Sequence, residues 1–168
     1  MPQVWLSIGS NIDREKNICG AVKSLQEAFG ELVLSSVYES QAVGFEGDPF
    51  YNMVVGLGTE LPVRSLNNCF RDIEKKHGRI RGGKKFASRT LDIDLLLYGD
   101  GVISEEGIEI PRNEITQYAF VLLPLAEVAG EMRHPVDGRT YQQLWKAFDQ
   151  EQQQLWVVDL ELLPSAAK

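Results

Sequence analysis

The hydrophobic and polar positions of this chain switch between the two-residue period of a β-strand and the longer period of an α-helix. Apolar side chains recurring three and four positions apart predict two helices that end at Gly30 and Gly78. Asp13 stands at the expected N-cap of the first helix, and Pro62 in the first turn of the second. Short apolar runs bounded by turn residues predict strands over residues 4–8, 32–38, 50–57 and 90–98. The order is therefore βαββαβ.

The rest of the chain predicts a smaller set of elements. After the turn Gly99-Asp100-Gly101 we expect a short returning strand over residues 108–110, helices over residues 117–129 and 141–148, and an apolar tail over residues 155–163. The whole pattern predicts an α+β fold with a ferredoxin-like core, in which helices pack on a mainly antiparallel sheet and a C-terminal extension follows. We expect one domain over residues 1–168.

Composition fits this interpretation. A chain of 168 residues with 43% hydrophobic and 24% charged content can bury the core of one globular domain. We find neither a secretory leader pattern nor an apolar stretch long enough to span a bilayer, so a cytoplasmic protein without a membrane partner is expected. Cys19 and Cys69 lack metal-ligand spacing, and we expect both to be small core residues.

Charge is distributed unevenly along the chain. The net charge of −7 disfavours a general nucleic-acid binder, because affinity for a phosphate backbone comes mainly from Lys and Arg. Residues 71–89, however, contain eight basic and two acidic residues. This basic segment suits a compact polyanion such as a nucleoside triphosphate, and its plain alternative is a solvated face.

Two carboxylates directly follow the basic segment. Strand alternation places Asp92 and Asp94 together on one face and the apolar residues between and beside them on the other. Neighbouring like charges are costly without a compensating cation, and hard carboxylate oxygens favour magnesium that shares substrate phosphates. The structural alternatives are an exposed edge of a sheet and a structural salt bridge.

Arginines and a glycine pair in the preceding loop extend this hypothesis. The guanidinium groups of Arg79, Arg81 and Arg89 can bind phosphate oxygens bidentately, and the chain contains no Walker or Rossmann glycine motif that would do so instead. Gly82 and Gly83 are candidate hinges of a lid, with an ordinary turn as the alternative.

A second group of residues suggests a pocket for a flat heterocycle. Asn52 interrupts an otherwise apolar strand, where its amide could read the donor and acceptor edge of a ring, or simply bond to backbone. Phe86 and Phe120 could supply stacking surface, although each could equally belong to the core.

Taken together, five ordered motifs resemble the family of 6-hydroxymethyl-7,8-dihydropterin pyrophosphokinases. These folate-pathway enzymes transfer pyrophosphate from ATP to a pterin hydroxymethyl group. The resemblance covers nearly the whole chain and rests on Ile8-Gly-Ser-Asn11, Phe50-Tyr-Asn52, Ile73-Glu74 with Gly78-Arg-Ile-Arg81, Arg89-Thr-Leu-Asp-Ile-Asp94 and Phe120-Val-Leu-Leu-Pro-Leu125.

The resemblance implies a role for each matching position. It implies two magnesium ions on Asp92 and Asp94, with Asp94 a candidate acceptor for the hydroxyl proton, and ATP and the pterin as the small-molecule partners of a monomer. Arg79 and Arg89 would serve catalysis with Asp94. The nucleotide would meet Glu74, Arg81, Leu95, Arg112 and Tyr118, and the pterin would meet Ser40, Val43, Phe50, Asn52, Phe86 and Phe120.

The chain departs from the family pattern at several positions. Residues 86–88 read Phe-Ala-Ser instead of Trp-Gly-Pro, Arg112 replaces a histidine, Tyr118 replaces an arginine, and residues 41–42 replace a proline. These departures motivate a second hypothesis, a catalytically altered paralogue that binds pterin or nucleotide. A third is a ferredoxin-like RNA-binding or regulatory module, which the acidic charge disfavours.

Overall fold

The computed structural model of the protein describes residues 1–41, 48–78 and 91–162. Its strands are β1 (Gln3–Ser10), β2 (Val33–Leu34), β3 (Val37–Ser40), β4 (Phe50–Gly58), β5 (Asp92–Tyr98), β6 (Ile103–Glu105), β7 (Ile108–Ile110) and β8 (Trp156–Val158). Its helices are α1 (Arg14–Phe29), α2 (Val63–Lys76), α3 (Glu114–Gln117), α4 (Ala119–Ala129) and α5 (Tyr141–Ala147).

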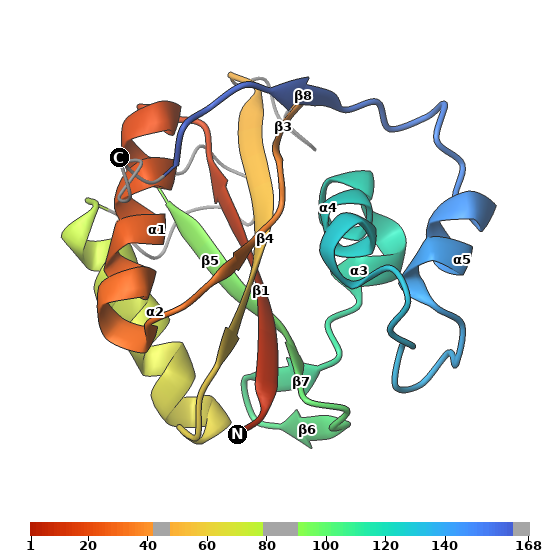
Figure 1. Ribbon diagram of the computed structural model, residues 1–168, viewed down its shortest axis with the longest axis horizontal. Coiled ribbons are helices and arrows are strands. Elements are labelled where there is room, and N and C mark those ends of the chain that lie inside the picture. The colour runs from red at the N-terminus through yellow and green to blue at the C-terminus, as the bar shows by residue number, and fades with distance from the viewer. Residues whose placement is uncertain (42–47, 79–90, 163–168) are drawn as a thin grey trace.

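The main sheet confirms the ferredoxin-like prediction. Its strand order is β5-β1-β4-β3-β8, with β2 paired to β4, and all of these pairings are antiparallel. The two helices α1 and α2 lie on one face, as Figure 1 shows, in the positions that the βαββαβ order requires. The edge strand β5, which carries both predicted metal ligands, therefore has a strand neighbour only in β1 among the described residues.

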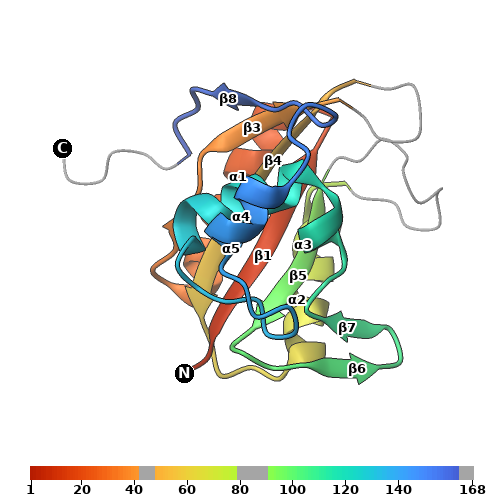
Figure 2. The same ribbon diagram turned by 90° about the vertical axis from the view of Figure 1, so that its right-hand side faces the viewer.

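Apolar cores lie on both faces of this sheet. Ile8, Ile18 and Phe70 belong to the core beneath α1 and α2. Trp5 and Tyr141 belong to the core beneath α3, α4 and α5. Figures 1 and 2 show the resulting three layers, with the sheet between the two groups of helices. None of the helices in the described part of the chain is long and apolar enough to cross a bilayer.

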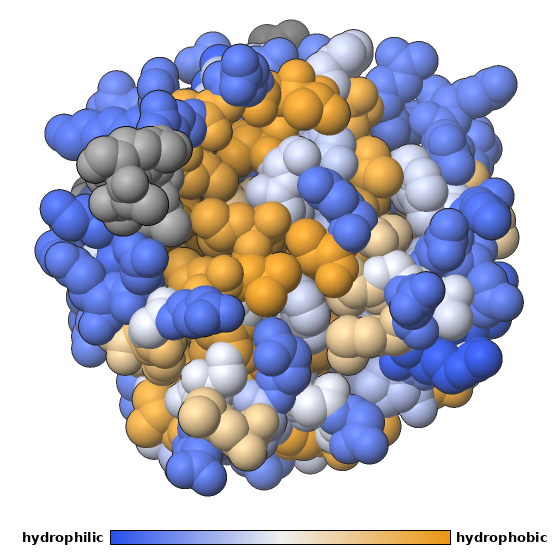
Figure 3. All heavy atoms as spheres, viewed as in Figure 1, coloured by the Kyte–Doolittle hydropathy of each residue, from blue (hydrophilic) through white to orange (hydrophobic). Residues whose placement is uncertain are grey.

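The predicted strand over residues 32–38 is divided into β2 and β3. Two serines cause the break because their polar groups leave the regular ladder. Ser35 exchanges two hydrogen bonds with the backbone of Val54, of which its own hydroxyl accepts one at 2.8 Å. Ser36 donates from its backbone N–H and its hydroxyl to Glu127 of α4. Val33 of β2 is 43% exposed. Figure 3 shows that apolar residues gather near the middle of this face of the molecule.

The C-terminal half differs from the prediction in its details. Tyr118 has extended backbone angles (φ −126°, ψ 128°) and separates α3 from α4, so the predicted helix over residues 117–129 begins only at Ala119. The strand over residues 108–110 is confirmed as β7, which pairs with β6 in a separate hairpin. The predicted apolar tail instead adds β8 to the edge of β3, and Leu160 and Leu162 continue onto the core beneath α1 and α2.

Three local predictions about side chains need correction. Asp13 precedes α1 as expected, but its φ of 46° places it in the left-handed region and its side chain makes no capping hydrogen bond. Cys19 and Cys69 are free and half-buried on their helices, so neither is fully buried as expected, although Cys69 packs against the core beneath α1 and α2. Burial raises the pKa of both thiols.

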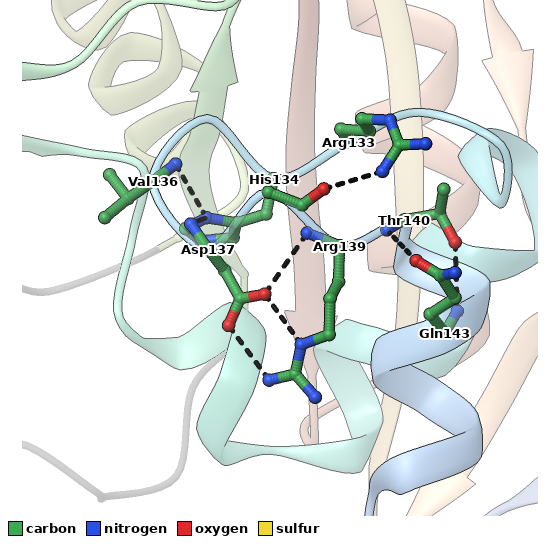
Figure 4. A network of polar contacts seen from close by, with 8 residues as sticks. Arg133, His134, Val136, Asp137, Arg139, Thr140 and Gln143 are labelled. Carbon is green, nitrogen blue, oxygen red and sulfur yellow. Dashed lines mark hydrogen bonds and ion pairs between the residues drawn. The ribbon is translucent and has the colours of Figure 1, made fainter.

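The loop between α4 and α5 is held by its own polar contacts (Figure 4). Nδ1 of His134 accepts hydrogen bonds from the backbone N–H groups of Val136 at 3.1 Å and Asp137 at 3.0 Å. Arg139 forms an ion pair with Asp137 at 2.7 Å. Thr140 then begins α5 with a capping box that includes Gln143.

Candidate active site

One cross-strand row of the sheet brings the two predicted subsites together. Gly9 of β1 pairs with Asp92 of β5 on one side and with Asn52 of β4 on the other. Tyr38 of β3 follows Asn52 in the same row. Side chains of one row point to the same face of a sheet, so Asp92 and Asn52 share the face that α4 covers.

The glycine in this row leaves the space that the polar side chains need. A Cβ atom at Gly9 would lie 3.1 Å from Oδ1 of Asn52 and 3.7 Å from the ring of Phe50. A larger residue would therefore press on the predicted pterin subsite from below. The close approach of Asn52 therefore explains why the second position of the motif Ile8-Gly-Ser-Asn11 is a glycine.

The two aspartates are electrostatic neighbours, as predicted. Burial and the charge of Asp92 raise the pKa of Asp94 from 3.8 to about 7, while Arg112 and Arg71 oppose this shift. A carboxylate with so high a pKa is poorly compensated by the cations around it. The pair is therefore suited to a divalent cation.

The two carboxylates offer hard oxygen donors, of the kind that magnesium prefers. Within residues 1–41, 48–78 and 91–162, no cluster of three or more His, Cys, Asp or Glu side chains could hold a metal ion. Magnesium commonly takes one or two carboxylates and completes its octahedron with waters and substrate phosphates. Asp92 and Asp94 meet that requirement.

Arg112 lies beside the carboxylate pair. Its guanidinium donates to both oxygens of Glu114, at 3.2 and 2.6 Å, and its backbone N–H donates to the carbonyl of Leu96 at 3.1 Å. Burial lowers its pKa, but the bond to Glu114 and the charges of Asp94 and Asp92 outweigh burial and raise it. The position where the family pattern has histidine therefore carries a permanent charge next to the predicted metal ligands.

Glu74 is fully buried against the edge strand. Its Oε2 accepts hydrogen bonds from the backbone N–H of Ile93 at 2.8 Å and from Nη1 of Arg71 at 3.0 Å. The same Arg71 nitrogen donates to the carbonyl of Ile93 at 3.2 Å. Sequence reasoning counted Arg71 only as part of a basic segment, and the available signal was its position three residues before Glu74 on a helix. Leu95 follows on the same strand, with its side chain in the core.

The predicted pterin residues lie on β3, β4 and α4. Nδ2 of Asn52 donates to Oγ of Ser40 at 2.7 Å, and both residues are buried. Ser40 pairs across the sheet with Phe50. At the start of α4, Tyr118 and Phe120 stack with ring centroids 5.0 Å apart. The structure thus brings an amide and a hydroxyl together, and it places two aromatic rings at the N-terminal end of the helix that covers their face.

A contact that the sequence did not predict joins this region to α4. The Tyr38 hydroxyl donates to Oε1 of Glu127, 89 positions later in the sequence, at 2.8 Å. Burial, followed by the bond to Glu127, raises the pKa of Tyr38. Five predicted site residues, by contrast, lie outside the described residues and stay predictions: Val43, Arg79, Arg81, Phe86 and Arg89.

The chain is similar to several known proteins. The family model of 7,8-dihydro-6-hydroxymethylpterin-pyrophosphokinase (HPPK) matches residues 5–130. The 2-amino-4-hydroxy-6-hydroxymethyldihydropteridine pyrophosphokinase of Aquifex aeolicus is 36% identical over 138 residues, which cover 81% of this chain and 86% of that protein. The protein of the same name from Porphyromonas gingivalis is 38% identical over 136 residues, covering 77% and 92%.

Two further similarities involve longer proteins. The folic acid synthesis protein fol1 of Pneumocystis carinii is 35% identical over 138 residues, and the match spans 80% of this chain but 18% of that protein. The crystal structure of Plasmodium falciparum HPPK-DHPS superposes with a TM-score of 0.67 at 15% identity, covering 88% of this chain and 43% of that one. This last similarity shows that the fold is shared.

Proposed function

The chain belongs to the 7,8-dihydro-6-hydroxymethylpterin-pyrophosphokinase family, whose members are pyrophosphokinases of folate biosynthesis, and we propose how its residues carry out the transfer of pyrophosphate. The reaction moves pyrophosphate from ATP to the hydroxymethyl group of 6-hydroxymethyl-7,8-dihydropterin and gives AMP and the pterin diphosphate. The observation that supports it best is the row of the sheet in which Asp92 and Asn52 flank Gly9. This row can bring the two substrates to one face.

Magnesium binding is assigned to the paired aspartates. Asp92 and Asp94 would hold two ions together with the ATP phosphates, and the ions would neutralise charge on the triphosphate. The raised pKa of Asp94 supports this assignment, because an added cation relieves the repulsion that causes the shift. Asp94 is also the candidate acceptor of the hydroxyl proton.

The nucleotide would lie along the edge strand. Arg112 is fixed beside the aspartates by Glu114 and can contact a phosphate oxygen without leaving its partner, since a guanidinium has five N–H donors. Glu74, Leu95 and Tyr118 would complete the described part of this subsite. Arg79, Arg81 and Arg89 would add positive charge. We expect catalysis to consist mainly of positioning and charge stabilisation.

The pterin would lie over β3 and β4. The bond from Asn52 to Ser40 fixes the plane of the amide, which can then read the donor and acceptor edge of the ring. Phe50 and Phe120 would contact its faces, together with Val43 and Phe86. We further propose that the protein acts as a monomer in the cytoplasm.

AMP formation from ATP and magnesium, with and without the pterin, tests the proposal. We expect AMP that depends on the pterin and disappears in the double variant Asp92→Ala/Asp94→Ala. Binding of pterin or ATP without AMP release would instead support the catalytically altered paralogue.

A further inference from the structure

Two charged residues of α2 close a ring of hydrogen bonds around one residue of β5. Glu74 has an exposed fraction of 0%, and its Oε2 accepts from the N–H of Ile93 at 2.8 Å. Nη1 of Arg71 donates to the carbonyl of Ile93 at 3.2 Å and to Oε2 of Glu74 at 3.0 Å. Both backbone polar groups of Ile93 are therefore held by the helix.

Ile93 is the residue between the two predicted metal ligands. Asp92 and Asp94 flank it directly in β5, at the edge of the described sheet. An edge strand has one side without a neighbouring strand to fix its path. At Ile93, Arg71 and Glu74 lie on that side and bond the backbone N–H and carbonyl, as a second neighbouring strand would. Two peptide units join Ile93 to the Cα atoms of Asp92 and Asp94, and these Cα atoms carry the two carboxylates. Anchoring the two peptide units therefore limits the directions in which the carboxylates point.

Arg71 is the more accessible of the two α2 residues. Its side chain is 32% exposed, so it can be replaced without opening the core.

We infer that Arg71 and Glu74 are positioning residues that hold Asp92 and Asp94 in the arrangement required to bind magnesium with ATP. This inference rests on the proposed function. It gives Glu74 a role through the backbone of β5, in addition to any contact with the nucleotide, and it adds Arg71, which belongs to none of the predicted subsites. Mutation of partners that orient metal ligands typically costs about 10- to 100-fold in metal affinity or activity.

Three variants and one control separate positioning from general stability. Arg71→Met removes both of its hydrogen bonds, Arg71→Lys keeps the charge, and Glu74→Gln keeps an oxygen for Ile93 while removing the ion pair. Arg64→Met is the matched control, because Arg64 lies on the same helix and pairs with Glu105 of β6 at 3.3 Å. That pair contacts neither aspartate.

Two readouts that do not require turnover are measured on each protein. One is the affinity for Mn²⁺ in the presence of a non-hydrolysable ATP analogue, followed by electron paramagnetic resonance. The other is the exchange rate of the Ile93 amide hydrogen. We expect Arg71→Met and Glu74→Gln to lose about tenfold or more in Mn²⁺ affinity and to exchange this hydrogen faster. Arg71→Lys should recover part of the affinity, and Arg64→Met should match the wild type.

The possible outcomes distinguish this inference from the proposed function. One outcome is that Arg71→Met and Glu74→Gln exchange the Ile93 amide hydrogen faster and still bind Mn²⁺ with the affinity of the wild type. That result would show that the contact serves only the local structure, and it would overturn the inference. Should the wild type release no pterin-dependent AMP while Mn²⁺ affinity still depends on Arg71, the proposed reaction fails and the positioning role stands. A wild type that binds no Mn²⁺ with the analogue would overturn both. If Glu74→Gln does not fold, the two Arg71 variants alone test the inference, because the Arg71 side chain is partly exposed and its replacement leaves the core intact.

Discussion

Replacing Asp94 with asparagine should stabilise the metal-free protein at high pH. The variant keeps the size of the side chain and removes the charge that burial and Asp92 oppose. The folded-state pKa of Asp94 is about 7 against an ordinary value of 3.8, so the folded protein binds more protons than the unfolded chain between these two pH values. The stability of the wild type should therefore fall as pH rises through this window.

The size of the effect follows from the shift in pKa. A difference of about three pH units, at about 1.36 kcal/mol per unit, corresponds to at most about 4 kcal/mol above pH 7. For a domain of this size, that limit is equivalent to a rise in Tm of roughly 10 °C. Below pH 4 the carboxyl is protonated in both states, and Asp94→Asn should have nearly the stability of the wild type.

Urea unfolding between pH 4 and pH 8 with a chelator present, followed by tryptophan fluorescence, measures this difference. Asp137→Asn is a matched control of opposite sign, because the hydrogen bond with Arg139 lowers the pKa of Asp137 to about 2. Magnesium with an ATP analogue should raise the Tm of the wild type more than that of Asp94→Asn. An advantage for Asp94→Asn that is equal at pH 4 and pH 8, or absent at pH 8, would refute the electrostatic reasoning.

Three further predictions concern other parts of the structure. Gly9→Ala should raise the KM for the pterin and leave the KM for ATP unchanged in steady-state assays, because the added Cβ would lie 3.1 Å from Asn52. An equal rise in both KM values would contradict this prediction. Gly20→Ala should cost about 1–3 kcal/mol in urea unfolding, since its Cβ would lie 2.3 Å from His77, whereas a neutral effect would mean that the imidazole can move away. Burial lowers the pKa of His134, which is neutral as an acceptor in its loop, so protein stability should fall as pH drops below 6.5. His134→Asn keeps an acceptor and should flatten that dependence in thermal unfolding; an unchanged pH profile would locate the titration elsewhere.

Local sequence information was sufficient for the order of elements and the chemical character of the site. The βαββαβ order follows from periodicities that each segment carries by itself, and the strand order of the sheet follows from the fold class. Alternation along a single strand was enough to predict that Asp92 and Asp94 share a face. A strand pattern cannot reveal competing side-chain bonds, which is why the break at Ser35 and Ser36 was missed.

Cross-strand register and long-range contacts could be decided only by the tertiary structure. The row that joins Asp92, Gly9 and Asn52 depends on how three strands align, and a shift of one residue would have turned Asp92 and Asn52 toward opposite faces. The anchoring of Ile93 by Arg71 and Glu74 depends on where a helix meets a sheet edge. The raised pKa of Asp94 likewise depends on burial and on charges from other elements. Solvation and Coulomb interactions act through space, so they cannot be predicted from the residues that neighbour Asp94 in the sequence.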